Sequence, residues 1–280
     1  MVRIITDSAA DFEPFELEKL NISCTPLSVA LDGQEYVENI NLSKDQFFSL
    51  LASTGDTPKS SQPSPEFLMN FFAEAKAAGD EALFISLSSA ISGTYQTAVM
   101  TCEDADYDGC YVFDSLNATA GERLLVEYAV QLRDEGKSAK EIIAALETIR
   151  DKIVLFACID TLEYLYRGGR ISQTVYKLGT MAQVKPIIRV SEEGTIEVPA
   201  KAMGMRKGLD FVCKRLDAQK PNRDHKMYIM YTADRTNGEI LAQKLSAMGY
   251  EIPEEQIVQV GAAIGSHIGP NACGLTYVAE

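Results

Sequence analysis

The sequence contains no tryptophan, only two histidines, and no pair of cysteines in C-x-x-C spacing. Neither His225 nor His267 lies near a close pair of cysteines, so the short-range ligand sets of zinc sites are absent. We therefore expect no metal and no cofactor. The cysteines are expected to be reduced and structural, because several lie in apolar stretches where a thiol packs as a small buried hydrophobe. The six are Cys24, Cys102, Cys110, Cys158, Cys213 and Cys273.

Long apolar runs are missing as well. The longest candidate, residues 153–159, is far shorter than the roughly 20 residues that a membrane-spanning helix needs. The N-terminus turns polar at Thr6 after two isoleucines, so it lacks the apolar centre of a signal peptide. We therefore expect a cytoplasmic protein without stable membrane insertion.

Basic residues are scarce relative to acidic ones. The chain has 26 Lys and Arg against 40 Asp and Glu, which gives a formal charge of -14. Such a charge repels phosphate backbones, so we expect no nucleic-acid partner. Hydrophobic residues make up 46% of the 280 residues and charged residues 24%, which is typical of a globular protein with a sizeable core.

Through the first 160 residues, short β-branched runs alternate with helical patterns. Strand and helix alternate five times, which predicts a doubly wound, mostly parallel sheet. Ligands of such sheets bind at the carboxyl ends of the strands, here in the loops after Ile5, Leu87 and Phe113. Residues 54–64 show no periodicity and are predicted to be a loop. The expected strands are 2–5, 22–31, 82–87, 110–113 and 153–159, and the expected helices are 14–20, 43–51, 65–79, 94–103, 121–135 and 138–150.

The second part of the chain follows a different pattern. A predicted hairpin, 184–190 with 195–202, precedes helices and strands in mixed order. The further expected helices are 205–217 and 236–248, and the further strands are 227–231, 256–260 and 274–278. We therefore predict an α/β protein of two domains in firm contact: an α/β domain over 1–160 and an α+β domain over 161–280.

Two loops carry several hydroxyl groups directly before a predicted helix. Residues 88–95, Ser-Ser-Ala-Ile-Ser-Gly-Thr-Tyr, join a buried strand to a helix, whose free N–H groups and dipole suit a carboxylate or phosphate. The simpler interpretation is that Ser92 only caps this helix. Residues 60–65 form the second loop, and its simpler interpretation is a solvated connection capped by Ser64.

Two further segments carry polar groups between glycines. His267 lies in a glycine-spaced stretch after a strand, where an imidazole can donate a hydrogen bond to a ligand, although a lone histidine is more often structural. Arg170 ends the segment Tyr-Arg-Gly-Gly-Arg at 166–170, which is also compatible with a plain helix end and solvated arginines.

Taken together, the short motifs of this chain resemble the DegV family in their order and span the whole sequence. They are Thr6-Asp7-Ser8, Ser-Gln-Pro-Ser at 61–64, Ser-Gly-Thr-Tyr at 92–95, Asp160 to Glu163 running into Arg167-Gly-Gly-Arg170, Lys185-Pro186 and His267-Ile-Gly-Pro270. The resemblance implies a protein that holds one long-chain fatty acid between two domains. It also implies a partner, a fatty acid kinase subunit that converts the presented carboxylate to an acyl phosphate.

The resemblance extends to individual residues. It implies that the fatty acid carboxylate is bound by Ser60, Ser92, Gly93 and His267. Residues near the same head group or facing the kinase are Ser61, Thr94 and Arg170. The chain departs from the family in having Ser60 where threonine is usual and Asn271 where the family has glycine. Serine keeps the hydroxyl, and asparagine tolerates left-handed backbone geometry better than most residues.

The acyl chain requires an apolar tunnel, although ordinary core packing is the more common role for any one of the candidate residues. The candidates are Phe71, Phe72, Phe84, Ile91, Ile159, Leu165, Met181 and Ile264. A lipid-binding protein without catalytic residues is the expected class. The alternative is a hydrolase or phosphotransferase that uses the loop around Ser92, but the sequence has no nucleophile elbow, P-loop or dinucleotide fingerprint.

Overall fold

The first of three sheets consists of four parallel strands. The computed structural model describes residues 1–177 and 183–280. In the order β2-β1-β6-β7, the strands are β2 (Ile22–Thr25), β1 (Val2–Asp7), β6 (Glu81–Ser86) and β7 (Cys110–Asp114). Their carboxyl ends therefore lie along one edge of the sheet.

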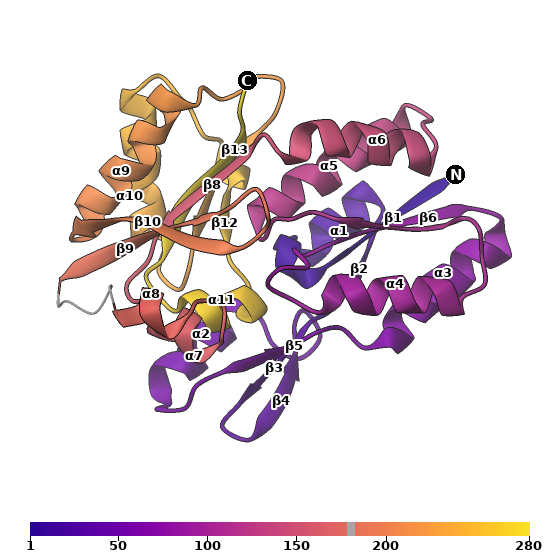
Figure 1. Cartoon of the computed structure of the whole chain (residues 1–280), viewed down its shortest axis with the longest axis horizontal. Helices are drawn as coiled ribbons and strands as arrows, with labels where there is room; N and C mark the ends of the chain where they lie inside the picture. Colours follow the sequence, from indigo (N-terminus) through magenta and orange to yellow (C-terminus); the bar gives the residue numbers. More distant parts are fainter. Residues whose placement is uncertain (178–182) are drawn as a thin grey trace.

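Helices cover both faces of this sheet (Figure 1). Successive side chains of a strand point to opposite faces, so Ile4 and Ile85 pack against one group of helices and Ile5 and Phe84 against the other. The first group is α5 (Ala120–Asp134) and α6 (Ala139–Arg150), and the second is α3 (Pro65–Ala78) and α4 (Thr94–Asp104). The prediction of a doubly wound parallel sheet is confirmed for these four strands.

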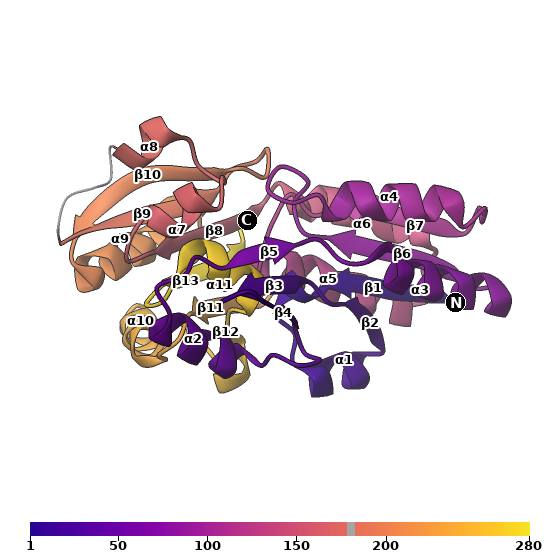
Figure 2. The same ribbon diagram turned by 90° about the horizontal axis from the view of Figure 1, so that it is seen from below.

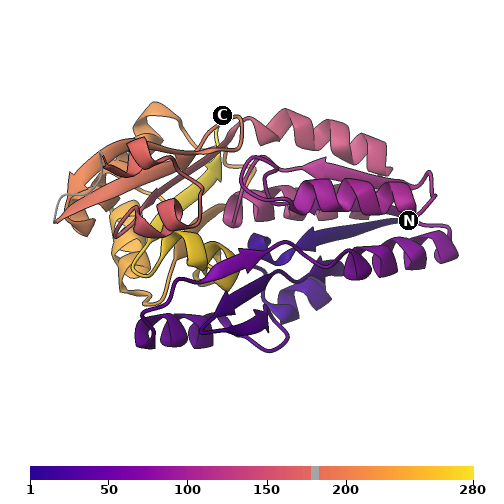
Figure 3. The ribbon, with the colours of Figure 1, turned by 60° about the horizontal axis from the view of Figure 1, so that its bottom comes forward.

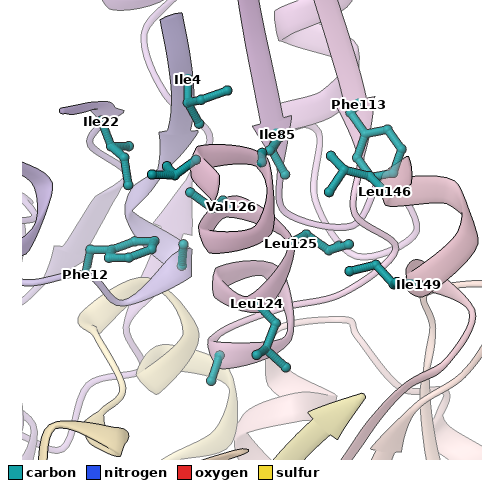
Figure 4. Packing of buried hydrophobic residues seen from close by; sticks show 14 of the residues in the cluster. Ile4, Phe12, Ile22, Ile85, Phe113, Leu124, Leu125, Val126, Leu146 and Ile149 are labelled. Atoms are coloured by element: carbon teal, nitrogen blue, oxygen red, sulfur yellow. The ribbon is translucent and has the colours of Figure 1, made fainter. Parts of the chain in front are cut away.

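The largest apolar cluster surrounds α5. Figure 4 shows this helix between strand residues such as Ile4 and Ile85 and residues of α6 such as Leu146 and Ile149. Full burial of one such side chain stabilises the fold by about 1.5–3 kcal/mol. The helix α1 (Pro14–Leu20) packs at the edge of the same cluster, next to β2.

The second sheet has six strands, and only one neighbouring pair is parallel. In the order β10-β9-β8-β13-β11-β12, they are β10 (Ile196–Met203), β9 (Val184–Val190), β8 (Ile153–Cys158), β13 (Cys273–Val278), β11 (Met227–Tyr231) and β12 (Ile257–Gln259). Two helices cover one face, α9 (Met205–Ala218) and α10 (Thr236–Ala247). The predicted hairpin and the mixed order of elements are confirmed.

A small third sheet lies beside the short helix α11 (Ala262–Ile268), as Figures 2 and 3 show. In the order β4-β3-β5, its strands are β4 (Gln34–Val37), β3 (Ser28–Leu31) and β5 (Lys59–Ser61). Further helices are α2 (Lys44–Ser53), α7 (Glu163–Arg167) and α8 (Gln173–Lys177), together with the 3-10 turns Ser8–Ala10 and Glu254–Gln256. Within the described ranges, no helix is both long and apolar enough to cross a bilayer.

The structure corrects several sequence-based predictions about strands. Residues 153–159 were expected to complete the first sheet, but β8 pairs with β9 and β13 of the second sheet. Residues 22–31 do not form one strand, because Pro26 separates β2 from β3, which belong to different sheets. The predicted loop 54–64 contains β5. The glycine-spaced stretch around His267, for which no element was predicted, forms α11. The division at residue 160 stays a prediction, and sheet membership favours a boundary before β8.

One cysteine prediction is wrong. Cys102 at the end of α4 and Cys110 at the start of β7 form a disulfide, because the short connection between these elements brings the two side chains together. Free thiols remain at Cys24, Cys158, Cys213 and Cys273.

Candidate functional site

A cavity of about 240 Å³ lies where the loops after the parallel strands meet the second sheet and α11. Leu27 follows β2, Leu87 follows β6 and Ala118 follows β7, so three strand ends of the first sheet contribute to its wall. The other lining residues are Ser60, Ser61, Gln62, Ile91, Ser92, Gly93, Leu165, Arg170, Ile196, Ala263, Ile264, His267 and Ile268. The position agrees with the expectation that ligands bind beyond the carboxyl ends of these strands.

A serine and a histidine meet at the polar end of the cavity. The Ser60 hydroxyl and Nε2 of His267 lie 2.7 Å apart and share a hydrogen bond. Ser60 is held in place because β5 pairs with β3, where it lies opposite Val29. His267 comes from α11, more than 200 positions later in the chain. The fold therefore brings together two of the residues singled out in the sequence.

His267 is neutral over the physiological pH range. Burial lowers the pKa of its imidazole to about 4, and the positive charge of Arg170 lowers it further in the same direction. Nδ1 of the ring has no hydrogen-bond partner among the described residues and lies against Gly168, where a Cβ atom would come within 2.1 Å of it. The ring therefore occupies a space that only glycine leaves open.

The loop before α4 supplies the second set of hydroxyls. The Ser92 hydroxyl lies 2.9 Å from that of Thr94 and accepts a bond from the Thr94 N–H at 3.3 Å. The N-cap residue of α4 is Gly93. Ser92, which precedes it, accepts the bond from the first N–H of the helix and also lines the cavity. Thr94 is buried behind it. The oxygen Oε1 of Gln62 occupies the place where a Cβ of residue 93 would be.

Arg170 lines the cavity without an acidic partner among residues 1–177 and 183–280. Its Nε donates to the Ile91 carbonyl at 3.0 Å, and a terminal nitrogen donates to the Gly168 carbonyl. The two carboxylates closest in sequence are engaged elsewhere, Asp160 with Lys185 and Glu163 with Arg167. Burial lowers the pKa of this guanidinium. Arg170 therefore brings an uncompensated positive charge to the cavity.

A second, smaller cavity of about 50 Å³ lies next to the first. Four residues line both: Ala118, Ile196, Ile264 and Ile268. Almost all of the remaining wall is apolar or backbone, and it comes from the inner face of the second sheet: Leu155, Ala157, Ile188, Val190, Met230, Val260, Ala272, Cys273 and Gly274 among others. The polar groups therefore line the first cavity, and a smaller, almost wholly apolar cavity adjoins it.

The candidate tunnel residues divide into three groups. Ile91, Leu165 and Ile264 line the first cavity. Four others pack in apolar clusters outside it: Phe71, Phe72 and Phe84 between α3, α4 and the first sheet, and Ile159 beside α7. Met181 lies outside the described residues.

Sequence reasoning missed Gln62 and the strand-end residues Leu27 and Ala118. A signal for Leu27 and Ala118 existed, because both follow predicted parallel strands, where binding loops lie. Gln62 was not among the predicted ligands because it carries no hydroxyl group, although it lies between two serines in the sequence and lines the cavity.

The pairing of Ser60 with His267 resembles the first two members of a hydrolase triad, but the third is missing. A triad requires an acid that orients the histidine, whereas Nδ1 of His267 faces Gly168 and meets no acid in the part of the chain that the structure describes. A histidine with a pKa near 4 is also a weak general base at neutral pH. Within the described residues, no group of three or more acidic, histidine or cysteine side chains could hold a metal ion. The site is suited to holding an anion rather than to activating a nucleophile.

Fold and site together define an α/β protein with an amphipathic cavity between two sheets. The family model described as DegV family matches residues 1–280. A DegV domain-containing protein of Caldanaerobacter subterraneus is 30% identical over 278 residues, covering 99% of this chain and 98% of its own length. One of Clostridium perfringens is 31% identical over 287 residues, covering 99% and 97%. The chain belongs to the DegV family.

Solved structures with the same fold include several described by the lipid they bind. A fatty-acid-binding DegV family protein of Thermus thermophilus superposes with a TM-score of 0.90 at 29% identity, covering 100% of this chain and 99% of its own. A stearic-acid-binding protein of Eubacterium ventriosum gives 0.89 at 25% identity, covering 100% and 98%. DegV of Bacillus subtilis, a fatty acid binding protein, gives 0.86 at 25%, covering 100% and 99%.

Proposed function

We propose that this protein binds one long-chain fatty acid and presents its carboxylate to a separate fatty acid kinase, which forms the acyl phosphate. The observation that carries the proposal is a cavity lined by hydroxyls and a neutral histidine, next to an apolar inner cavity that shares four of its lining residues. The binding of fatty acids by relatives of the same fold supports it.

In this proposal the carboxylate is held by Ser60, Ser92, His267 and the backbone at Gly93. Hydroxyl, imidazole and backbone donors satisfy a carboxylate without a bidentate arginine contact, which would be stronger and would cover both oxygens. The oxygens therefore remain reachable for a second enzyme. Arg170, with no acidic partner in the described part of the chain, supplies a positive charge at the same entrance.

The acyl chain supplies most of the affinity. About fourteen methylene groups at about 0.8 kcal/mol each amount to roughly 11 kcal/mol of gross burial, before the costs of association. The head group then fixes the register of the chain in the cavities rather than the strength of binding. Since a kinase draws on ATP, we place the protein in the cytoplasm.

Lipid extraction tests the binding step. The purified protein is denatured, and the organic extract is analysed by mass spectrometry; we expect about one fatty acid per chain, because an empty apolar cavity is unfavourable. Protein that is free of lipid and shows no rise in melting temperature with added fatty acid would contradict the proposal.

The variant Arg170→Ala tests the presentation step. We expect it to retain its fatty acid and melting temperature but to lose acyl-phosphate formation when kinase and ATP are added, because a long cation at the entrance can meet the kinase or its phosphates. Arg167→Ala is the matched control, since Arg167 lies three residues away but is exposed and paired with Glu163. A wild-type rate for Arg170→Ala would exclude this role, as would ATP turnover without any kinase.

A further inference from the structure

Four carboxyl groups are buried together behind the cavity wall. Asp7, Asp11, Glu38 and Glu122, here called the acid cluster, are each at most 4% exposed. None of them forms an ion pair within the described ranges, because the nearby cations Lys44 and Arg123 pair with other carboxylates. Buried charges without a counter-ion are costly, so such a cluster requires an explanation other than stability.

Two members of the acid cluster hold the backbone of residues that line the cavity. Asp7 accepts a hydrogen bond from the Leu87 N–H at 2.8 Å, and Glu38 accepts one from the Ala263 N–H at 2.9 Å. Leu87 and Ala263 both line the first cavity. These carboxylates are therefore separated from the cavity by one layer of backbone and apolar side chains.

The other contacts of the acid cluster lead to the same wall. Ser8 donates to Glu38 at 2.5 Å and accepts from the N–H of Leu27, which also lines the cavity. Asp11 accepts from the Gly261 N–H at 2.7 Å, directly before α11. Both Glu38 and Asp11 lie so close to Gly261 that a Cβ there would come within 2.6 Å and 3.2 Å of their oxygens.

Burial shifts the titration of every member of the acid cluster toward the protonated form. Burial raises the pKa of both Asp7 and Asp11 to about 7, and it also raises the pKa of Glu38. Burial and the charge of Asp7 raise the pKa of Glu122 well above its ordinary value. Other groups facing the acid cluster shift these pKa values in both directions. The positive charges of Lys44 and Arg123 lower the pKa of Asp11, whereas the negative charge of Asp114 raises that of Glu122. Burial raises the pKa of the Cys24 thiol, which therefore stays protonated.

Two members of the acid cluster, Asp11 and Glu122, can take up a proton without losing the hydrogen bonds described here. Oδ2 of Asp11 and Oε2 of Glu122 are buried and have no hydrogen-bond partner within residues 1–177 and 183–280. The bond of Asp11 to Gly261 and that of Glu122 to Thr6 use the other oxygen of each group. A proton can therefore enter or leave while the cavity wall keeps its support.

We propose that the acid cluster takes up a proton from solvent when an anionic head group occupies the cavity, a linkage that rests on the proposed function because it requires a charged ligand. A negative charge on one side of a thin apolar wall favours the protonated form of carboxyls on the other side. By the same linkage, a rise in pH weakens binding and promotes release of the ligand.

The expected number of protons taken up on binding follows from electrostatics. A charge about 10 Å away in a medium of effective dielectric about 20 changes an acid dissociation constant about tenfold. For one carboxyl that titrates at pH 7, binding at this pH then takes up about 0.4 proton, and the affinity is about fivefold weaker at pH 8 than at pH 6. Two such carboxyls give about 0.8 proton.

Calorimetry in two buffers measures directly how many protons are taken up per bound ligand. Delipidated protein is titrated at pH 7 with laurate and with dodecane-1-sulfonate, in phosphate and in Tris, whose heats of ionisation differ. The sulfonate stays charged throughout, so proton uptake on binding it cannot come from the ligand. We expect about 0.4–0.8 proton for both ligands. Binding heat with no difference between buffers would overturn the inference, whereas no binding of laurate at any pH would contradict the proposed function instead.

Variants separate the acid cluster from His267, the other group that could accept a proton. Asp11→Asn keeps the oxygen that accepts from Gly261 and removes one titrating group, so uptake is expected to fall by about half and the pH dependence to flatten. His267→Gln is expected to weaken binding but to leave the protons taken up per bound ligand unchanged. Glu35→Gln is the matched control, an exposed acid on β4. Full uptake in Asp11→Asn, or its loss in His267→Gln, would overturn the inference.

Discussion

Substitution of Gly168 by alanine isolates the contribution of His267 to the binding site. The backbone of Gly168 has φ -75° and ψ -8°, which alanine adopts without strain. Its Cβ, however, would lie 2.1 Å from Nδ1 and 2.7 Å from Cε1 of the imidazole. The ring must therefore move by more than about 1 Å, which is enough to break its 2.7 Å hydrogen bond to Ser60.

Two effects of different size are expected from Gly168→Ala. Overpacking of a filled site lowers the free energy of unfolding by about 1–3 kcal/mol. Loss of one hydrogen bond at the head group lowers fatty acid affinity by about 1 kcal/mol, or about fivefold. Equilibrium unfolding and a fluorescent fatty acid displacement assay measure the two separately. Gly55→Ala is the control, because no atom lies within 4 Å of a Cβ at that position.

The double variant Gly168→Ala/His267→Ala decides whether the ring is the cause. Removal of the imidazole makes room for the new methyl group, so stability should recover relative to Gly168→Ala while affinity stays low. If the double variant is no more stable than Gly168→Ala, or if Gly168→Ala behaves like the wild type in both assays, the clash with His267 is not what couples these residues.

Three other changes have defined outcomes. Ser60→Ala and Ser92→Ala should each weaken fatty acid retention by about 1–3 kcal/mol, and unchanged phosphorylation of the bound lipid by kinase in the double variant would refute both assignments. Ala118 lines both cavities, so Ala118→Phe should reduce palmitate binding more than about tenfold while octanoate binds nearly as before. Equal losses for both ligands would refute the proposal that the acyl chain extends from the first cavity into the second. The pKa of Glu122 is raised by burial from an ordinary value of 4.5, so this carboxyl costs stability increasingly as pH rises above 4.5. Glu122→Gln should therefore match the wild type in urea unfolding at pH 4 and exceed it at pH 8 by at least about 1 kcal/mol, and an advantage confined to pH 4 would contradict the sign.

Local signals in the sequence predicted the helix starts well. Ser43 with Gln46 and Ser138 with Glu141 form the expected capping boxes, because both partners lie within one turn. The loop after Leu87 was expected to bind a ligand on the parallel-strand argument alone, and it lines the cavity. Signals of this kind need no knowledge of distant parts of the chain.

The features that the sequence did not reveal depend on distant partners. The apolar run of β8 suits a buried position in either large sheet, and only pairing with β9 and β13 decides between them. Asp7, Glu38 and Glu122 are separated by dozens of residues and follow no periodic pattern, so nothing local marks them as neighbours. The head-group residues were selected by family resemblance, because a serine before a helix is as often a simple cap.

The position of β13 in the second sheet affects the synthesis of the protein. This strand lies between β8 and β11, although it is the last strand of the chain. While the ribosome still covers β13, the strands β8 and β11 have no partner between them. The helix α11 leaves the exit tunnel only just before β13, because it directly precedes that strand in the chain. The first sheet can therefore fold during translation, whereas the second sheet and the lipid cavity close only after β13 has left the exit tunnel. Newly made chains expose the apolar faces of β8 and β11 for that interval, and the cavity is complete only once β13 has joined them.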